Sequence, residues 1–193
     1  MTKFADKRYY LAMFVSRNKD NQGVVGFRQR SRTFLTSKNT GELELDFLEF
    51  CNRGVHGENC RFYISVNERD HSVIYKGLQH YLIDNPGLDL TKMENRVASL
   101  AMKENAHLTK RFMFDYDGSK KYIDLFIDDV TESMGADNVI FMITETPNGF
   151  AVITEHGFDT RELLKKWGDC VSLKRDGMQF VKMKKKLEVL LDD

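Results

Sequence analysis

Two aspartates stand two positions apart at the end of an apolar run in the segment KRFMFDYDGSKKYIDLF, residues 110–126. Side chains alternate along a strand, so Asp115 and Asp117 are expected on the same face. Carboxylate oxygens are the ligands that Mg²⁺ and Mn²⁺ prefer, and paired acids can bridge two such ions during phosphoryl transfer. The competing explanation is structural, because Asp117-Gly118 is a favoured turn pair that would simply close the strand.

A third carboxylate, Asp176, follows the late apolar segment that begins at residue 170. Alternation places Lys174 and Asp176 on one side of that strand and its apolar residues on the other. If the strand lies beside the one carrying Asp115 and Asp117, the three acids converge. We therefore expect a site for Mg²⁺ or Mn²⁺, rather than zinc, at Asp115, Asp117 and Asp176, with Lys174 contacting phosphate.

The elements that must position these residues follow the order β-α-β-β-α-β. Apolar periodicity and turn residues predict strands over 111–117, 138–146, 150–157 and 170–183, the last bent at Gly177, and helices over 119–135 and 158–168. This is the ferredoxin-like, or RRM-like, plan. Its usual sheet has the first and third strands in the centre and the fourth beside the first, which is the neighbour relation that the metal site requires.

The N-terminal half adds further strands and helices. Patterning predicts strands over 8–17, 24–37 and 61–67 and helices over 43–54, 71–84 and 91–106, the last with a capping box at Thr91 and Glu94. The predicted fold class is therefore α+β. Residues 1–60 form an N-terminal α/β extension packed against a core of residues 61–193, either as two domains or as one.

The segment from Arg61 to Asp176 resembles the archaeo-eukaryotic primase superfamily, the primase-polymerases. The matching elements are Phe114-Asp115-Tyr116-Asp117, the hairpin Thr146-Pro147-Asn148-Gly149-Phe150, the late acid Asp176, and the upstream strand with Asn67 and Arg69. The resemblance implies an RRM-like core that binds nucleotides or nucleic acid at a divalent-metal carboxylate site and transfers nucleotidyl groups.

One family residue is missing. The family's hairpin carries a histidine that helps to bind the phosphates of the incoming nucleotide, and the corresponding position here is Val152. A diverged nucleotidyltransferase and a binding module without catalysis, for nucleic acid or a protein, are therefore both open. A third alternative is a haloacid dehalogenase-like phosphatase, because Asp115-Tyr116-Asp117-Gly118-Ser119 resembles the start of that family, in which the first aspartate is the nucleophile.

Arginines at alternate positions, Arg28, Arg30 and Arg32, would share one face of the strand predicted over 24–37. Such a row can contact phosphates, and Tyr9, Tyr10 and Phe34 are available to stack on bases. The alternative is an edge strand whose charges protect it against aggregation.

Cys51, His56 and Cys60 have a spacing close to that of zinc ligands, with a fourth ligand to come from Cys170, His71 or His80. Free cysteines are equally common as plain core residues. This segment is the alternative metal site.

Composition bears on the class of partner and on the compartment of the protein. The 193 residues carry 29 basic and 29 acidic side chains, so net charge does not argue for or against nucleic acid. The N-terminus is too polar for a signal peptide, and no apolar stretch approaches the ~20 residues that a membrane helix needs. With three cysteines, the expectation is a cytoplasmic protein with reduced thiols and no membrane contact.

Overall fold

The computed structural model describes residues 7–186, which divide into two compact units. Residues 7–64, 69–106 and 181–186 form the first unit, and residues 65–68 and 107–180 form the second. The chain therefore passes between the units four times. This division differs from the predicted boundary after residue 60, because the strand and helices that follow that point belong with the N-terminal strands.

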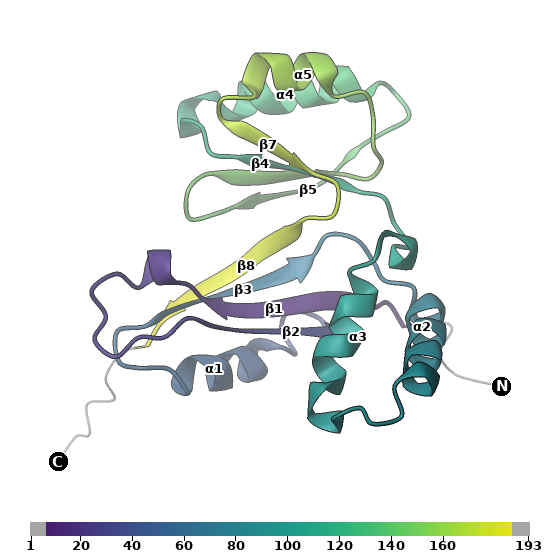
Figure 1. Cartoon of the computed structure of the whole chain (residues 1–193). Helices are drawn as coiled ribbons and strands as arrows, with labels where there is room; N and C mark the ends of the chain where they lie inside the picture. The colour runs from purple at the N-terminus through teal and green to yellow at the C-terminus, as the bar shows by residue number, and fades with distance from the viewer. Residues whose placement is uncertain (1–6, 187–193) are drawn as a thin grey trace. The chain divides into compact units, whose positions relative to one another are not determined.

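The first unit is a four-stranded sheet with helices (Figure 1). Its strands are β1 (Tyr10–Ser16), β2 (Arg30–Thr36), β3 (Asn59–Ser65) and β8 (Met178–Lys185), in the order β2-β1-β3-β8, and its helices are α1 (Glu44–Asn52), α2 (His71–Asp84) and α3 (Met93–Ala101), with 3-10 turns at Asn18–Asp20, Leu90–Lys92 and Glu104–Ala106. Helix α1 covers one sheet face, where Phe14, Phe62 and Phe47 pack in a buried cluster. The predicted strand over 24–37 starts later than expected, at Arg30.

Helix boundaries in this unit follow local capping chemistry. The side chain of Asp70 accepts hydrogen bonds from the backbone N–H groups of Ser72 and Val73, which fixes the start of α2. The predicted capping box at Thr91 and Glu94 is wrong. Asp89 instead caps a 3-10 turn by accepting from Thr91, and α3 begins after that turn.

The second unit has the element order β-α-β-β-α-β. Its strands are β4 (Phe112–Tyr116), β5 (Ile140–Glu145), β6 (Phe150–Thr154) and β7 (Val171–Lys174), and its helices are α4 (Ile123–Met134), preceded by a 3-10 turn at Lys120–Tyr122, and α5 (Arg161–Trp167). The sheet order is β5-β6-β4-β7, and every pairing in it is antiparallel. Helices α4 and α5 cover one sheet face, and Phe114, Tyr116, Phe126 and Val152 are buried beneath them (Figure 1).

The predicted final strand over 170–183 is two strands. It breaks at the turn before Gly177, after which the chain enters β8 of the other sheet. A Cβ on Gly177 would lie 2.4 Å from the terminal methyl of Met113, so the Met113 side chain packs closely against this turn. The protein is thus a mixed α+β structure with two antiparallel sheets. Among residues 7–186, no helix is long and apolar enough to span a bilayer.

Candidate functional site

Asp115 and Lys174 lie where the alternation predicts them, on the sheet face opposite α4 and α5. Their strands β4 and β7 are paired, with Met113 opposite Lys174 and Asp115 opposite Ser172. The Lys174 ammonium donates to Asp115 Oδ2 in a close ion pair, and both side chains are partly exposed. The carboxylate is therefore neutralised by a side chain of its own sheet, and Lys174 is engaged rather than presented to a phosphate.

Asp176 does not join Asp115 and Asp117, and the predicted convergence of the three acids is wrong. The register of β4 and β7 places Met113 opposite Lys174, so continuing it by two residues brings Asp176 level with Arg111. Asp176 is therefore offset from Asp115 by four positions and from Asp117 by six, roughly 13 and 20 Å at ~3.3 Å per residue. The prediction that β4 and β7 are neighbours was correct. Because they pair antiparallel, however, the carboxyl ends that carry the acids lie at opposite edges of the pair.

Contacts made by Asn67 confirm this position of Asp176. The Asn67 amide nitrogen donates to Asp176 Oδ1 at 3.3 Å, to the Arg175 carbonyl at 3.0 Å and to the Arg111 carbonyl at 3.4 Å. His107 Nε2 lies 3.1 Å from Asp176 Oδ2 on the other side of the carboxylate. Asp176 thus belongs to a polar cluster at the amino end of β4.

The predicted nucleotide contacts Asn67 and Arg69 are buried, 0% and 1% exposed. The side-chain carbonyl oxygen of Asn67 accepts hydrogen bonds from the Arg111 backbone N–H at 2.8 Å and from the Thr109 hydroxyl at 3.1 Å. The oxygen and the nitrogen of this amide are therefore both hydrogen-bonded within the protein. The Arg69 N–H donates to the Tyr9 carbonyl at 2.8 Å. The structure uses both residues as internal scaffold, where no ligand reaches them.

Asp117 lies beyond the end of β4 and is exposed. Its backbone N–H donates to the Cys170 carbonyl at 2.8 Å. The hairpin from Thr146 to Gly149 packs closely here, since a Cβ on Gly149 would lie 1.9 Å from the Tyr116 carbonyl oxygen. The hairpin therefore lies beside the end of β4 that carries the Asp115-Tyr116-Asp117 segment.

Val152, the position at which the sequence resemblance expects a histidine, has its side chain in the core. It pairs with Phe114 across β4 and β6 and is 0% exposed beneath the helices. The residue that shares the face of Asp115 is its partner Ala151, which is 2% exposed. A histidine at position 152 would thus point away from the carboxylates in this register.

The metal and phosphatase interpretations both lose support from this geometry. Within residues 7–186, no three histidine, cysteine, aspartate or glutamate side chains are grouped so that they could hold a metal ion. A haloacid dehalogenase-like site needs a parallel sheet behind its nucleophile, whereas β4 pairs antiparallel with both β6 and β7. The sheet around Asp115 thus differs from the parallel sheet that the phosphatase resemblance implies.

The three alternating arginines do not form a phosphate-binding row. Arg28 lies in the loop before β2 and is exposed, while Arg30 and Arg32 lie on β2, which is an edge strand. The Arg32 guanidinium donates to both carboxylate oxygens of Glu94, at 2.8 and 2.6 Å. This arrangement favours the alternative of a charged edge strand.

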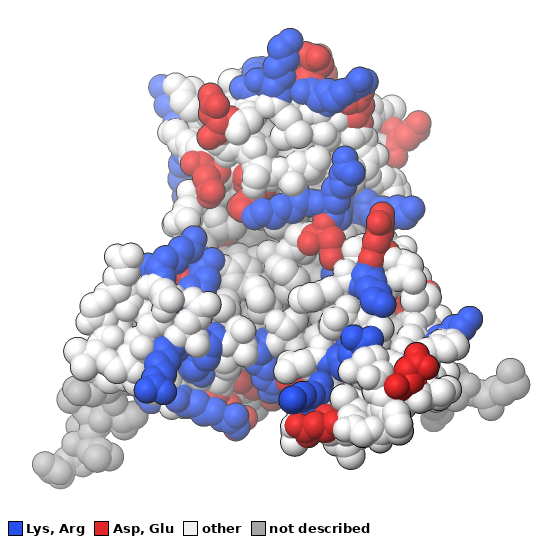
Figure 2. Space-filling view, viewed as in Figure 1, with Lys and Arg blue, Asp and Glu red and all other residues white. Residues whose placement is uncertain are grey.

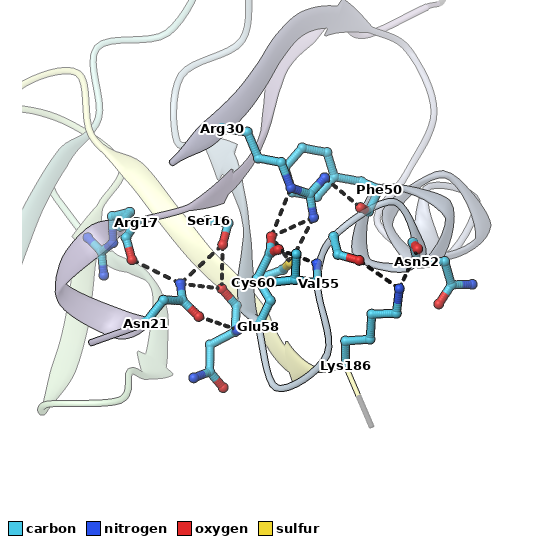
Figure 3. Close-up of polar contacts among 12 residues, drawn as sticks. Ser16, Arg17, Asn21, Arg30, Phe50, Asn52, Val55, Glu58, Cys60 and Lys186 are labelled. Carbon is cyan, nitrogen blue, oxygen red and sulfur yellow. Dashed lines mark hydrogen bonds and ion pairs between the residues drawn. The ribbon is translucent and has the colours of Figure 1, made fainter. Parts of the chain in front are cut away.

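Arg30 belongs to a polar network that holds the loop between α1 and β3 (Figure 3). Its guanidinium lies 2.6 Å from Glu58 Oε1 and donates to the Phe50 carbonyl at 2.7 Å. Burial opposes ionisation of Glu58, but hydrogen bonds from the Val55 N–H and from Arg30 outweigh it, so the pKa of this carboxyl lies below its ordinary value. Glu58 is 2% exposed, so this ion pair is structural.

The alternative zinc site does not form around His56. Cys51 and Cys60 are 1% and 0% exposed within the phenylalanine cluster, while His56 is exposed on the intervening loop. The hydrogen bond with the Cys51 thiol, and then burial, raise the pKa of Cys60, which favours its neutral form over the thiolate that zinc requires. The two cysteines are core residues in this arrangement.

An aromatic ladder in the first unit is the site that the sequence reasoning missed. The rings of Tyr9 and His71 stack with centroids 4.8 Å apart and 27° between their planes, and His71 and Tyr75 follow at 6.1 Å and 13°. Tyr75 is 54% exposed at the outer end. The ladder therefore ends in an accessible aromatic ring.

Exposed cations lie next to the ladder residues in the sequence. Lys7 and Arg8 directly precede Tyr9, and Lys76 follows Tyr75, all three with exposed side chains. Tyr9 was recognised from the sequence as a possible stacking residue. His71 and Tyr75 have the i, i+4 spacing that aligns side chains on a helix, but only the antiparallel bridge between Tyr9 and Arg69 brings β1 beside them.

No family model, curated protein or solved structure matches the chain.

Proposed function

We propose that this protein binds single-stranded nucleic acid without catalysing nucleotidyl transfer, and that the aromatic ladder of Tyr9, His71 and Tyr75 is its principal contact. The exposed ring of Tyr75 at the end of a stacked series is the observation that carries the proposal. A nucleobase that stacks on this ring extends the ladder by one step. Base–aromatic stacking contributes about 1–3 kcal/mol per base and tolerates any sequence.

The charges beside the ladder suit a polynucleotide. Lys7, Arg8 and Lys76 are exposed on the segments that carry the outer rings. The nearby acid Asp70 is occupied as the cap of α2, and its hydrogen bond from the Ser72 hydroxyl lowers its pKa. Phosphates of a strand whose base lies on Tyr75 would therefore meet cations. A duplex does not expose base faces, so the site selects single strands.

The geometry of the carboxylates supports a binding role over catalysis. Asp115 is paired with Lys174, and the register separates Asp176 from Asp115. Two-metal phosphoryl transfer needs carboxylates close enough to share ions. The β-α-β-β-α-β order with β4 and β6 central is the basis for proposing a ferredoxin-like second unit, a fold that often binds RNA without chemistry.

A metal-dependent nucleotidyltransferase of the primase-polymerase type is the second candidate. The close packing of the Thr146–Gly149 hairpin against Tyr116 and Asp117 favours it, because the hairpin then lies beside the two acids. In that case Asp115 and Asp117 would hold a Mg²⁺ or Mn²⁺ ion.

Fluorescence anisotropy with labelled 20-nucleotide single strands, DNA and RNA, at low ionic strength tests the leading proposal. We expect binding that weakens about tenfold in Tyr75→Ala and is retained in Tyr75→Phe, because stacking needs the ring and not the hydroxyl. Tyr122→Ala is the matched control, since Tyr122 is similarly exposed (49%) on the second unit. Absence of binding, or equal losses in Tyr75→Ala and Tyr122→Ala, would refute the proposal.

A further inference from the structure

Cys51 and Cys60 form a thiol pair where helix α1 contacts strand β3. Phe47 and Cys51 lie one helical turn apart on α1, and both are buried. Cys60 and Phe62 lie two residues apart on β3, so they share the face beneath α1. The Phe47 and Phe62 rings have centroids 5.6 Å apart, and the two thiols are hydrogen-bonded to each other. The sulfur atoms therefore meet one turn of α1 beyond the phenylalanine contact.

Charged groups lie beside this pair, which distinguishes it from cysteines that only fill an apolar core. The Arg30 guanidinium donates to Cys60 Sγ at 3.6 Å, and the same sulfur lies 3.6 Å from Glu58 Oε1 (Figure 3). Figure 2 shows mainly basic side chains over β8 and α1 on the visible face, and the exposed residues of β8 include Lys184. Nearby cations favour the reactive thiolate, whereas purely apolar surroundings make a buried thiol inert.

The two thiols differ in acidity. The hydrogen bond with Cys60 lowers the pKa of Cys51, although burial opposes this shift. The positive charges of Lys184 and Arg30 lower the pKa of Cys51 further, against the charge of Glu58. The same hydrogen bond raises the pKa of Cys60. Cys51 is therefore the thiol that more readily becomes a nucleophile, and Cys60 is the thiol that keeps its proton.

We propose that Cys51 and Cys60 are a redox-active pair that a hydroperoxide converts into a disulfide, which fastens α1 to β3. The Cys51 thiolate attacks one oxygen of hydrogen peroxide, the O–O bond breaks, and the leaving hydroxide takes up the proton that Cys51 released. The sulfur of Cys60 then attacks the Cys51 sulfenic acid, the S–O bond breaks, and the hydroxide leaves with the Cys60 proton as a second water. Two thiols are oxidised to one disulfide while one peroxide is reduced to two waters.

The loop between the two cysteines controls access to them. Cys51 and Cys60 are 1% and 0% exposed, so peroxide reaches them when residues 53–58 move away. Lys186 Nζ donates to the Gly54 carbonyl at 2.7 Å and holds this loop closed (Figure 3). Hydrogen peroxide is scarcely larger than water, so local opening of the loop suffices. We therefore expect oxidation over minutes to hours rather than seconds.

Peptide mass spectrometry of the full chain after oxidation tests the proposal. The folded, reduced protein is exposed to about 1 mM hydrogen peroxide, and the remaining thiols are then blocked with N-ethylmaleimide in urea. We expect a Cys51–Cys60 disulfide in most molecules, and dithiothreitol should reverse it. Cys170, on the second unit, is the comparison thiol and should not become linked to either cysteine.

Two variants separate the roles of the sulfur atoms. In Cys60→Ala, the sulfenic acid at Cys51 has no thiol to condense with, so dimedone should label it. In Cys51→Ala, dimedone labelling of Cys60 should be about tenfold lower. Circular dichroism shows whether each variant is folded, and the disulfide of the wild-type chain is a test that needs neither variant.

Three results with the wild-type chain overturn the proposal. In the first, both thiols still react with the maleimide after peroxide treatment. In the second, Cys51 proceeds to sulfinic acid without forming a disulfide. In the third, the disulfide forms only when peroxide is added in urea, which would show that the folded chain does not bring the two sulfur atoms together.

The melting temperature of the Cys170→Ser chain should rise by about 5–10 °C on oxidation, because the disulfide restricts the unfolded state. Dithiothreitol should restore the original value. Cys51→Ala treated in the same way controls for methionine oxidation and should show no rise. An oxidised chain that carries the disulfide but melts at the temperature of the reduced chain would overturn its assignment as a link that fastens α1 to β3.

Discussion

The side-chain carbonyl of Asn67 accepts a hydrogen bond from the backbone N–H of Arg111 at 2.8 Å, deep inside the second unit. The same amide donates to the Arg175 carbonyl at 3.0 Å. One fully buried side chain therefore joins three stretches of the unit that are far apart in sequence. Its segment, residues 65–68, is also the shortest piece of chain that the unit contains.

Replacing Asn67 by alanine should destabilise the second unit by about 2–3 kcal/mol, because buried donors and acceptors lose their partners. Asn67→Asp should cost at least as much, since a carboxylate cannot donate to the Arg175 carbonyl and is a buried charge. Urea unfolding followed by circular dichroism measures the loss. Asn148→Ala, at an exposed hairpin position, should change stability by less than ~0.5 kcal/mol.

Local signals in the sequence were sufficient for the type and order of most helices and strands, though not for all of their bounds. Helix α2 was predicted at its observed bounds from its residue pattern and the stop at Asn85-Pro86, and the structure adds Asp70 as the cap of its start. The neighbouring positions of β4 and β7 also followed from the element order.

The predictions that failed depended on the direction of strand pairing and on contacts between residues far apart in the sequence. Placing Asp176 beside Asp115 required the pairing sense of β4 and β7, which alternation alone does not contain. The stacking of Tyr9 on His71 required a bridge between β1 and the residue before α2, which no local pattern indicates. The bend at Gly177 was predicted, but the passage of the chain from β7 into β8 of the other sheet depends on pairing with distant strands.

Gly149→Ala should destabilise the second unit by at least ~3 kcal/mol, because the new Cβ would meet backbone atoms of Tyr116 and Asp117 that cannot move independently. Gly87→Ala is the control, since a Cβ there has open space around it and should have little effect. Thermal unfolding distinguishes the two. Equal melting temperatures for both variants would show that the hairpin does not pack on β4 as described.

Manganese should bind weakly or not at all to the wild-type chain in isothermal titration, because the Lys174 ammonium already neutralises Asp115. Lys174→Ala should increase the affinity for Mn²⁺, and the gain should disappear in the Lys174→Ala, Asp115→Asn double variant. Lys120→Ala removes a lysine from another exposed ion pair, with Glu145, and serves as the control. Tight binding by the wild type that Asp117→Asn abolishes would instead favour the nucleotidyltransferase candidate.

Lowering the pH should reduce the free energy of unfolding of the first unit, because Glu58 becomes protonated. The pKa of this carboxyl is held below its ordinary 4.5 in the folded chain by the Val55 N–H and Arg30, against the opposing effect of burial. Because the folded state binds the proton less readily than the unfolded state, the ionised pair stabilises the fold fully above about pH 4.5. This stabilisation is lost as the pH falls below that value toward the folded pKa.

Glu58→Gln should therefore cost about 2–4 kcal/mol at pH 7, where the Arg30 guanidinium loses its buried counter-charge. The difference between wild type and variant should narrow below pH 4, because the wild-type carboxyl is then protonated too. Glu49→Gln is the matched control. Its ion pair with Arg53 is exposed and should contribute less than ~1 kcal/mol at any pH. Urea unfolding of the three proteins between pH 3 and 7 measures these differences, and a gap that stays constant across the range would contradict an ionised Glu58 in the folded chain.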